Sequence, residues 1–144
     1  MAVKNIVTNE EKLSLVSFPV VYSQEVLDIA NDLVDTAKKH AVSGLGCVGL
    51  ACNQIGIFKR IITVYYGGEW VVMINPKIVE SWAGRFNARE ACLSRPGKNV
   101  SKARFKKIRV DYIDINGHEI TQQFTKFTAR VVQHEVDHLN GLYI

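Results

Sequence analysis

The sequence predicts an α+β fold, in which antiparallel β-sheets wrap around a C-terminal metal-binding helix and one long helix lies near the N-terminus. Three observations carry this prediction. Apolar residues recur at helical spacing over residues 24–40, β-branched and aromatic residues gather over residues 60–124, and an H-E-x-x-H motif lies near the end of the chain. Strands in the middle of a chain with a helix at each end favour an α+β domain. With 144 residues, the chain is expected to form one domain, residues 1–144.

The first long helix is predicted over residues 24–40. Residues 1–23 before it look irregular, and Pro19 is expected to fix a turn or an extended stretch there. Ser23 is a suitable N-cap, because its side-chain oxygen can accept a hydrogen bond from the first turn. The apolar residues at helical spacing are Val26, Leu27, Ile29, Ala30, Leu33, Val34 and Ala37. One face of this helix is therefore expected to pack on the core.

A glycine-rich segment, residues 44–56, follows the helix. Its four glycines allow the backbone to approach another group closely. The segment lacks the G-x-x-x-x-G-K-S/T pattern of a phosphate-binding loop, so a phosphate site is not expected there.

The middle of the chain is predicted to form strands joined by tight turns. Gly67-Gly68 reads as a hairpin turn, Pro76 separates two strands, and Asn116-Gly117 is the strongest hairpin signal in the sequence. The expected strands are residues 60–66, 70–75, 77–82, 104–115 and 118–124.

A last helix is predicted after these strands. Thr125 or Thr128 can cap its start, and Gly141 lies where a left-handed residue would end it. The apolar residues that would bury one face of this helix are Val131, Val132, Val136 and Leu139.

His134, Glu135 and His138 in this helix form a metal-binding pattern. Residues four apart share one helix face, so both imidazoles can bind one divalent ion, and Glu135 can take a proton from a water on it. The alternative is a pair of surface histidines on a C-terminal helix. The apolar neighbours count against that alternative, because an unpaired polar triplet in a core is costly.

The third metal ligand is expected to come from upstream of the motif. Six residues follow His138, and none is a good ligand, so the downstream Glu or His of common metalloproteases is missing. A thiolate beside two histidines is a strong ligand for transition metals. The upstream candidates are Cys47, Cys52, Cys92, His40, His118 and several carboxylates.

Composition and charge are those of an ordinary globular protein, with 47% hydrophobic residues, 22% charged residues and a net charge of +4. Cations alternate with apolar residues at Lys102, Arg104, Lys106, Lys107 and Arg109, and a solvated strand face is favoured there over a nucleic-acid patch. Three cysteines favour a reducing compartment. No secretory signal or membrane-spanning run is visible, so a cytoplasmic protein without a membrane or specific nucleic-acid partner is expected.

Three segments together resemble the motifs of the peptide deformylase family. They are residues 49–54 (GLACNQ), 90–94 (EACLS) and 133–138 (QHEVDH), in the family's order and at suitable separations. The likeness includes the first long helix, the Ile74-Asn75-Pro76 step and the Asn116-Gly117 hairpin, so it spans nearly the whole chain.

The resemblance implies hydrolytic removal of the formyl group from the N-terminal formyl-methionine of nascent polypeptides, with release of formate. By matching position, it implies that Cys92, His134 and His138 bind the metal and that Glu135 is the general base and acid. It also implies that two groups donate hydrogen bonds to the developing oxyanion, namely Gln54 and the backbone N–H of Leu93.

The same resemblance implies how substrate and metal are chosen. Gly49 and neighbouring backbone, Leu50 included, would pair with the substrate as an added strand, while Val48 and Val131 would line the methionine pocket. The metal would be Fe²⁺, with Ni²⁺ or Co²⁺ as good substitutes and Zn²⁺ as a poor one, whereas the residues alone favour Zn²⁺. Glu90 and Asp137 are candidates to accept the far N–H of a ligand histidine.

The chain departs from the family pattern at three positions. Cys47 and Ala91 stand where the family has glycine, and Cys52 stands where it has alanine. If residue 91 needs a positive φ angle, alanine would cost about 1 kcal/mol and could move the donor on Leu93. Many bacterial members of the family continue into a C-terminal helix implicated in ribosome docking, whereas this sequence ends soon after the metal-binding motif. Only transient proximity to the ribosome is therefore expected. The protein is expected to be a monomer.

Two alternatives stand beside a deformylase. One is a metallopeptidase or other amidohydrolase that acts on a different N-acyl peptide. The other is a catalytically weak, deformylase-like module that binds peptide termini, and its support in the sequence is Ala91 and Cys47.

Overall fold

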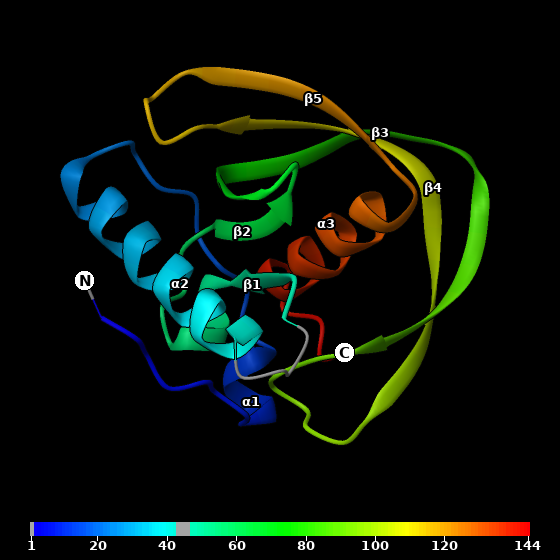
Figure 1. The fold of residues 1–144 in the computed structure, drawn as a ribbon, viewed down its shortest axis with the longest axis horizontal. Coiled ribbons are helices and arrows are strands. Elements are labelled where there is room, and N and C mark those ends of the chain that lie inside the picture. Colours follow the sequence, from blue (N-terminus) through cyan, green and yellow to red (C-terminus); the bar gives the residue numbers. More distant parts are fainter. Residues whose placement is uncertain (1, 43–46) are drawn as a thin grey trace.

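The computed structural model describes residues 2–42 and 47–144 (Figure 1). Gly44 and Gly46 of the predicted glycine-rich segment lie outside these residues. In chain order the elements are α1 (Glu10–Leu13), α2 (Gln24–Val42), β1 (Gly49–Ala51), the 3₁₀ turn η1 (Cys52–Ile55), β2 (Ile61–Tyr66), β3 (Glu69–Ala91), β4 (Asn99–Ile113), β5 (Glu119–Thr125) and α3 (Lys126–Leu139). No helix within the described ranges is long and apolar enough to cross a membrane.

The five strands form one antiparallel sheet in the order of the chain, so β1 and β5 are its edges. Figure 1 shows the long β3–β4 ribbon curving around one side of α3, with α2 on the far side of β1 and β2. The predicted α+β class, with antiparallel strands wrapped around the last helix, is confirmed.

Two apolar clusters fill the opposite faces of the central strands. α3 packs against one face, where Ile62, Met73 and Ile108 lie, and α2 packs against the other, where Ile61 and Ile74 lie. Successive residues of a strand point to opposite faces, which is why neighbours such as Ile61 and Ile62 belong to different clusters. Burial on both faces fixes β2 and β3 beneath α3 and so fixes the helix that carries the H-E-x-x-H motif.

The N-terminal part confirms the long helix and adds a short one. The Ser23 hydroxyl accepts a hydrogen bond from the backbone N–H of Val26 at 3.2 Å, as an N-cap should. Residues 1–23 were expected to be irregular, and α1 contradicts this locally. A four-residue helix is too short to show a periodic pattern, although its cap, Asn9, is a typical one.

β3 and β4 are longer than predicted. β3 passes through Pro76, where a break was expected, and continues to Ala91. The ladder is irregular at Pro76, since the register shifts between Ile74 and Lys77, and a bulge tolerates a residue without an N–H. β4 begins at Asn99 and not at residue 104.

The structure confirms the positions predicted for the Asn116-Gly117 hairpin and for the two ends of α3. The N–H of Asp114 donates to the carbonyl of His118 at 2.9 Å, so the turn holds Asn116 and Gly117, and Gly117 has φ +81°. Thr125 is the N-cap residue of α3, although its side chain makes no capping hydrogen bond. Gly141 follows the helix with φ +77°.

Candidate active site

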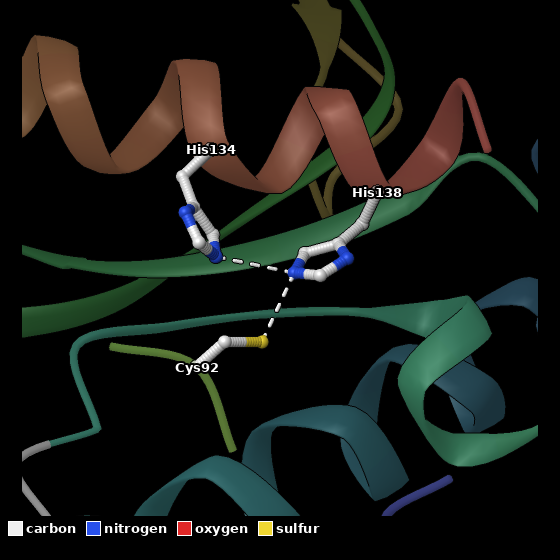
Figure 2. Close-up of side chains that lie close together, drawn as sticks. All are labelled: Cys92, His134 and His138. Atoms are coloured by element: carbon white, nitrogen blue, oxygen red, sulfur yellow. Dashed lines mark hydrogen bonds between the residues drawn. The ribbon is translucent and has the colours of Figure 1, made fainter. Parts of the chain in front are cut away.

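Three side chains, from α3 and from the end of β3, lie close together (Figure 2). His134 and His138 lie one turn apart on α3, and Cys92 directly follows β3. Nε2 of His138 lies 3.1 Å from Nε2 of His134 and 3.3 Å from Sγ of Cys92. Figure 2 shows the thiol and both rings pointing toward one another. Of the upstream candidates, only Cys92 joins the two histidines among the described residues.

The chemistry of these three groups fits a divalent transition-metal ion. Their ligand atoms all lie within 4.8 Å of one another, and a thiolate with two imidazole nitrogens is a typical donor set for such ions. One carboxylate oxygen of Glu135, Oε1, is buried and has no hydrogen-bond partner among the residues that the structure describes. A buried carboxylate oxygen of this kind needs a water or ligand proton, which the centre of a hydrolytic site provides.

Glu90 holds the ring of His134. Nδ1 of His134 donates to the Glu90 carboxylate at 2.7 Å, which leaves Nε2 facing the ligand cluster. Arg104 donates twice to the same carboxylate, at 2.6 and 2.9 Å, and also contacts Asp137. Glu90 therefore makes the predicted contact with a ligand histidine, whereas Asp137 pairs with Arg104.

The pKa values of the two histidines shift in opposite directions. Burial works to lower the pKa of His134, but hydrogen bonds with Cys92 and Glu90 and the charge of Glu135 raise it to about 10. Burial, together with the charges of His134 and Arg104, lowers the pKa of His138 to about 3. The ring of His138 is therefore neutral near pH 7 and can bind a cation, and a cation bound to His134 would take the place of the proton on that ring.

The pKa values of the two carboxylates beside the cluster also shift in opposite directions. Burial works to raise the pKa of Glu90, but hydrogen bonds from Arg104 and His134 lower it to about 2. Burial raises the pKa of Glu135 to about 7, although the charge of His134 opposes the shift. Glu90 is therefore a fixed anion, and Glu135 can both accept and return a proton near neutral pH.

The predicted oxyanion donors lie beside Cys92. The side-chain amide of Gln54 donates to Sγ of Cys92 at 3.4 Å and to the hydroxyl of Ser94 at 3.1 Å. Its oxygen accepts from the N–H of Ala51 at 3.0 Å, which fixes the orientation of the amide. Within the described part of the chain, nothing accepts a hydrogen bond from the backbone N–H of Leu93, so this donor is available to a ligand.

A cleft of about 470 Å³ opens in front of these groups. Val48, Gly49 and Val131 line it, as do Gln54 and Leu93. Leu50 does not line it, because its side chain is fully buried against α2. Only the backbone of Leu50 is left to contact a peptide along the open edge of β1.

Gly49 is required where β1 passes the carboxylate of Glu135. A Cβ at this position would come within 2.8 Å of both Oε2 of Glu135 and a methyl group of Val131. The nearby thiol of Cys47 donates to the carbonyl of Gly49 at 3.5 Å, and burial raises the pKa of this thiol to about 12. Cys52 is fully buried in the core. Both cysteines therefore serve in packing as protonated thiols.

Ala91 does not need a positive φ angle. It is the last residue of β3, paired with Asn99, and it is absent from the residues with left-handed backbone. The condition under which strain was expected at this position is therefore not met, and such strain does not displace the donor on Leu93.

Two cations of the site were missed. Arg104 was assigned to a solvated strand face, but its side chain is buried between Glu90 and Asp137. It shares its strand face with Ile108 and Val110, both an even number of residues away, and this parity was the available signal. Arg130, which lines the cleft one turn before His134, carried no signal in the sequence.

The chain is similar to known proteins in sequence and in fold. The polypeptide deformylase family model matches residues 3–144. The chain is 40% identical over 116 residues to the peptide deformylase of Clostridium beijerinckii, which covers 81% of this chain and 82% of that protein. A structure of class I type b peptide deformylase from Acinetobacter baumannii superposes with a TM-score of 0.88 at 32% identity, covering 99% of this chain and 97% of that one. The PDF of the Vibrio parahaemolyticus bacteriophage VP16T, solved with actinonin, gives 0.85 at 35% identity and coverages of 97% and 99%.

Proposed function

The chain belongs to the peptide deformylase family, and we propose that Cys92, His134, His138 and Glu135 carry out the family's reaction in it. The reaction is hydrolysis of the formyl group on the N-terminal methionine of a polypeptide, which yields formate and a free amine. The observation that supports these assignments best is the convergence of one thiol and two imidazoles beside a buried carboxylate.

The metal ligands are Cys92, His134 and His138, with Glu90 and Arg104 holding the ring of His134 in place. When bound, the divalent ion polarises the formyl carbonyl and makes water a better nucleophile. We favour Fe²⁺ because of the family resemblance, with Ni²⁺, Co²⁺ or Zn²⁺ as substitutes.

The remaining residues bind the substrate and move its protons. Glu135 takes a proton from the attacking water and delivers it to the leaving amine, a role that its pKa of about 7 suits. Gln54 and the N–H of Leu93 donate to the formyl oxygen as it gains charge, and each well-placed donor contributes roughly 3 kcal/mol. The open edge of β1 at Gly49 pairs with the peptide backbone, and Val48 and Val131 contact the methionine side chain.

A test of the function measures formate release from formyl-Met-Ala-Ser. Protein prepared anaerobically with Fe²⁺ is expected to turn over rapidly, zinc-loaded protein slowly, and metal-stripped protein not at all. Because three structural relatives were solved with actinonin bound, actinonin is expected to inhibit the iron form. Release of formate that does not depend on metal would overturn the assignment of the site.

The variant Glu135→Gln separates catalysis from metal binding. It keeps the size of the side chain but removes the proton acceptor, so turnover should fall by at least about a hundredfold. Metal content, measured by elemental analysis, should stay at one ion per chain. Unchanged turnover in this variant would remove Glu135 from the mechanism.

The biological setting is inferred from the substrate. A formylated nascent chain is met where translation takes place, so we infer a cytoplasmic monomer with transient proximity to the ribosome. Residues 1–144 act as one catalytic domain in this proposal, with no membrane partner and no specific nucleic acid.

A further inference from the structure

Where the cleft touches α3, it does so on the side of His134 that faces the start of the helix. The residues of α3 that line it are Arg130, Val131, His134 and Glu135. His138 lies on the closed side, where it is almost fully buried and contacts Cys92. The space available to the first side chain of a bound formyl-peptide therefore extends toward Arg130.

Arg130 is within reach of that side chain. It lies four residues before His134, so the two side chains stack on one helix face about one turn apart. A turn rises about 5.4 Å, which an extended side chain of methionine length can span. The guanidinium of Arg130 therefore lies within reach of the end of such a side chain.

The N–H groups of the Arg130 guanidinium can donate hydrogen bonds to a ligand. Its Nε lies 3.8 Å from the Glu90 carboxylate, too far for a hydrogen bond, and its carbon lies 4.6 Å from the centre of the Phe127 ring. No group within residues 2–42 or 47–144 accepts a hydrogen bond from it, and the side chain is 27% exposed. Glu90 keeps two hydrogen bonds from Arg104, so Arg130 can turn to a ligand without leaving this carboxylate unpaired.

Arg130 also separates the cleft from a second cavity of about 630 Å³. The apolar part of this cavity is formed by Ala83, Phe86 and Phe127, and the rest of its lining is Lys106, Lys107, Thr125, Lys126 and Arg130. None of these residues is acidic, so the second cavity is positive, whereas on the cleft side Arg130 lies near the Glu90 carboxylate.

We propose that Arg130 determines specificity for the first side chain, and that it extends acceptance from methionine to side chains of the same length that end in a strong hydrogen-bond acceptor. Methionine sulfoxide is the nearest such side chain. The proposal rests on the proposed function. A thioether sulfur is a weak acceptor, whereas a sulfoxide oxygen can take a charge-assisted hydrogen bond from the guanidinium.

The experiment compares three formylated tripeptides that differ only in the first residue: methionine, methionine sulfoxide and norleucine. Norleucine has the length of methionine without an acceptor. The value of kcat/KM for each is measured with the wild type and with Arg130→Met in the same metal form. The ratio of sulfoxide to norleucine is expected to fall about tenfold or more in Arg130→Met, the loss of one hydrogen bond to a charged group.

A matched control is Arg85→Met. Arg85 lies 4.5 Å from the centre of the Phe105 ring, a contact like that of Arg130 with Phe127, but it lines neither cavity. The ratio should stay at the wild-type value in this variant. If Arg130→Met does not fold, Arg130→Lys keeps the charge without the planar donor set and should give an intermediate ratio.

The outcomes separate this inference from the function itself. If the wild type releases formate from formyl-Met-Ala-Ser but the ratio is the same in the Arg130 variants, the specificity role is wrong and the function stands. If no tripeptide releases formate, the proposed function fails first.

Discussion

At the scale of single residues, Arg104 links the proposed metal ligands to the sheet. Its guanidinium joins Glu90 of β3 and Asp137 of α3, and only 3% of the residue is exposed. Glu90 in turn holds His134, so one cation of β4 fixes both the position of α3 and the orientation of a ligand ring. A carboxylate buried this deeply is stable as an anion only while its partners remain.

Replacing this cation is expected to destabilise the whole protein. In Arg104→Met, the Glu90 and Asp137 carboxylates lose their shared partner, and the free energy of unfolding should fall by about 3–5 kcal/mol. Arg109→Met is the matched control, because Arg109 pairs with Glu80 on the surface, with side chains 42% and 51% exposed. That pair should contribute less than about 1 kcal/mol. Urea unfolding of both variants measures the difference in the free energy of unfolding. Equal losses in the two variants would show that the buried contacts of Arg104 stabilise the protein no more than a surface ion pair does.

Residue roles could be predicted where a motif fixes them and not where folding creates them. The histidines four apart and Glu135 between them follow from the helix alone. The choice of Cys92 among the upstream candidates depended on the resemblance, since Cys92 and His134 are brought together only by the bend of β3 around α3. Arg130 was missed because a single cation on a helix face has no pattern that marks it as part of a cleft.

At the scale of elements, the C-terminal end of α3 is closed by a Schellman motif. The N–H of Leu142 donates to the carbonyl of Asp137, and the N–H of Gly141 donates to that of His138. Gly141 also packs on the backbone of Ser14, where a Cβ would lie 2.6 Å from the carbonyl oxygen. The end of the metal-binding helix is thereby joined to the segment after α1.

Replacing Gly141 by alanine should therefore lower the free energy of unfolding by more than the strain of its positive φ angle alone. Gly141→Ala adds strain at φ +77°, about 1–2 kcal/mol, and a contact with Ser14 that costs about 1–3 kcal/mol more. Gly84→Ala is the matched control, since Gly84 has φ +75° with no atom within 4 Å of its Cβ position. The difference in the free energy of unfolding between the variants reports the contact with Ser14. If the two losses are the same, α3 is not anchored to this segment through Gly141.

Elements with strong local signals were predicted well, and their extents were not. The helix at residues 24–42 and the Asn116-Gly117 turn have local causes, namely apolar periodicity and a left-handed glycine. β3 continues past residue 82 because β4 pairs with it as far as Ala91, through a kink at which Ala83 has φ +66°. Pairing with a distant strand is not encoded in the local pattern. The strand that leads to Cys92 was therefore predicted to end too early, at residue 82.

At the scale of the whole molecule, the proposed metal site joins parts of the chain that are far apart in sequence. Cys92 is at the end of β3, and His134 and His138 are on α3. The unfolded chain does not hold these three groups together, so an ion bound by all of them binds the native state alone. Metal binding and folding are therefore linked.

Removal of the metal should lower the unfolding temperature. An ion present at a hundred times its dissociation constant stabilises the native state by about 2.7 kcal/mol, and stripping the ion with a chelator removes this contribution. Calorimetry or thermal circular dichroism of zinc-loaded and stripped wild type measures the shift. The control is Cys92→Ala, in which addition of zinc should give little shift, whatever the stability of the variant itself. A shift of wild-type size in Cys92→Ala would mean that the ion stabilises the protein from another place, such as the exposed His118 beside Asp114, and that the convergence of Cys92, His134 and His138 is not the metal site.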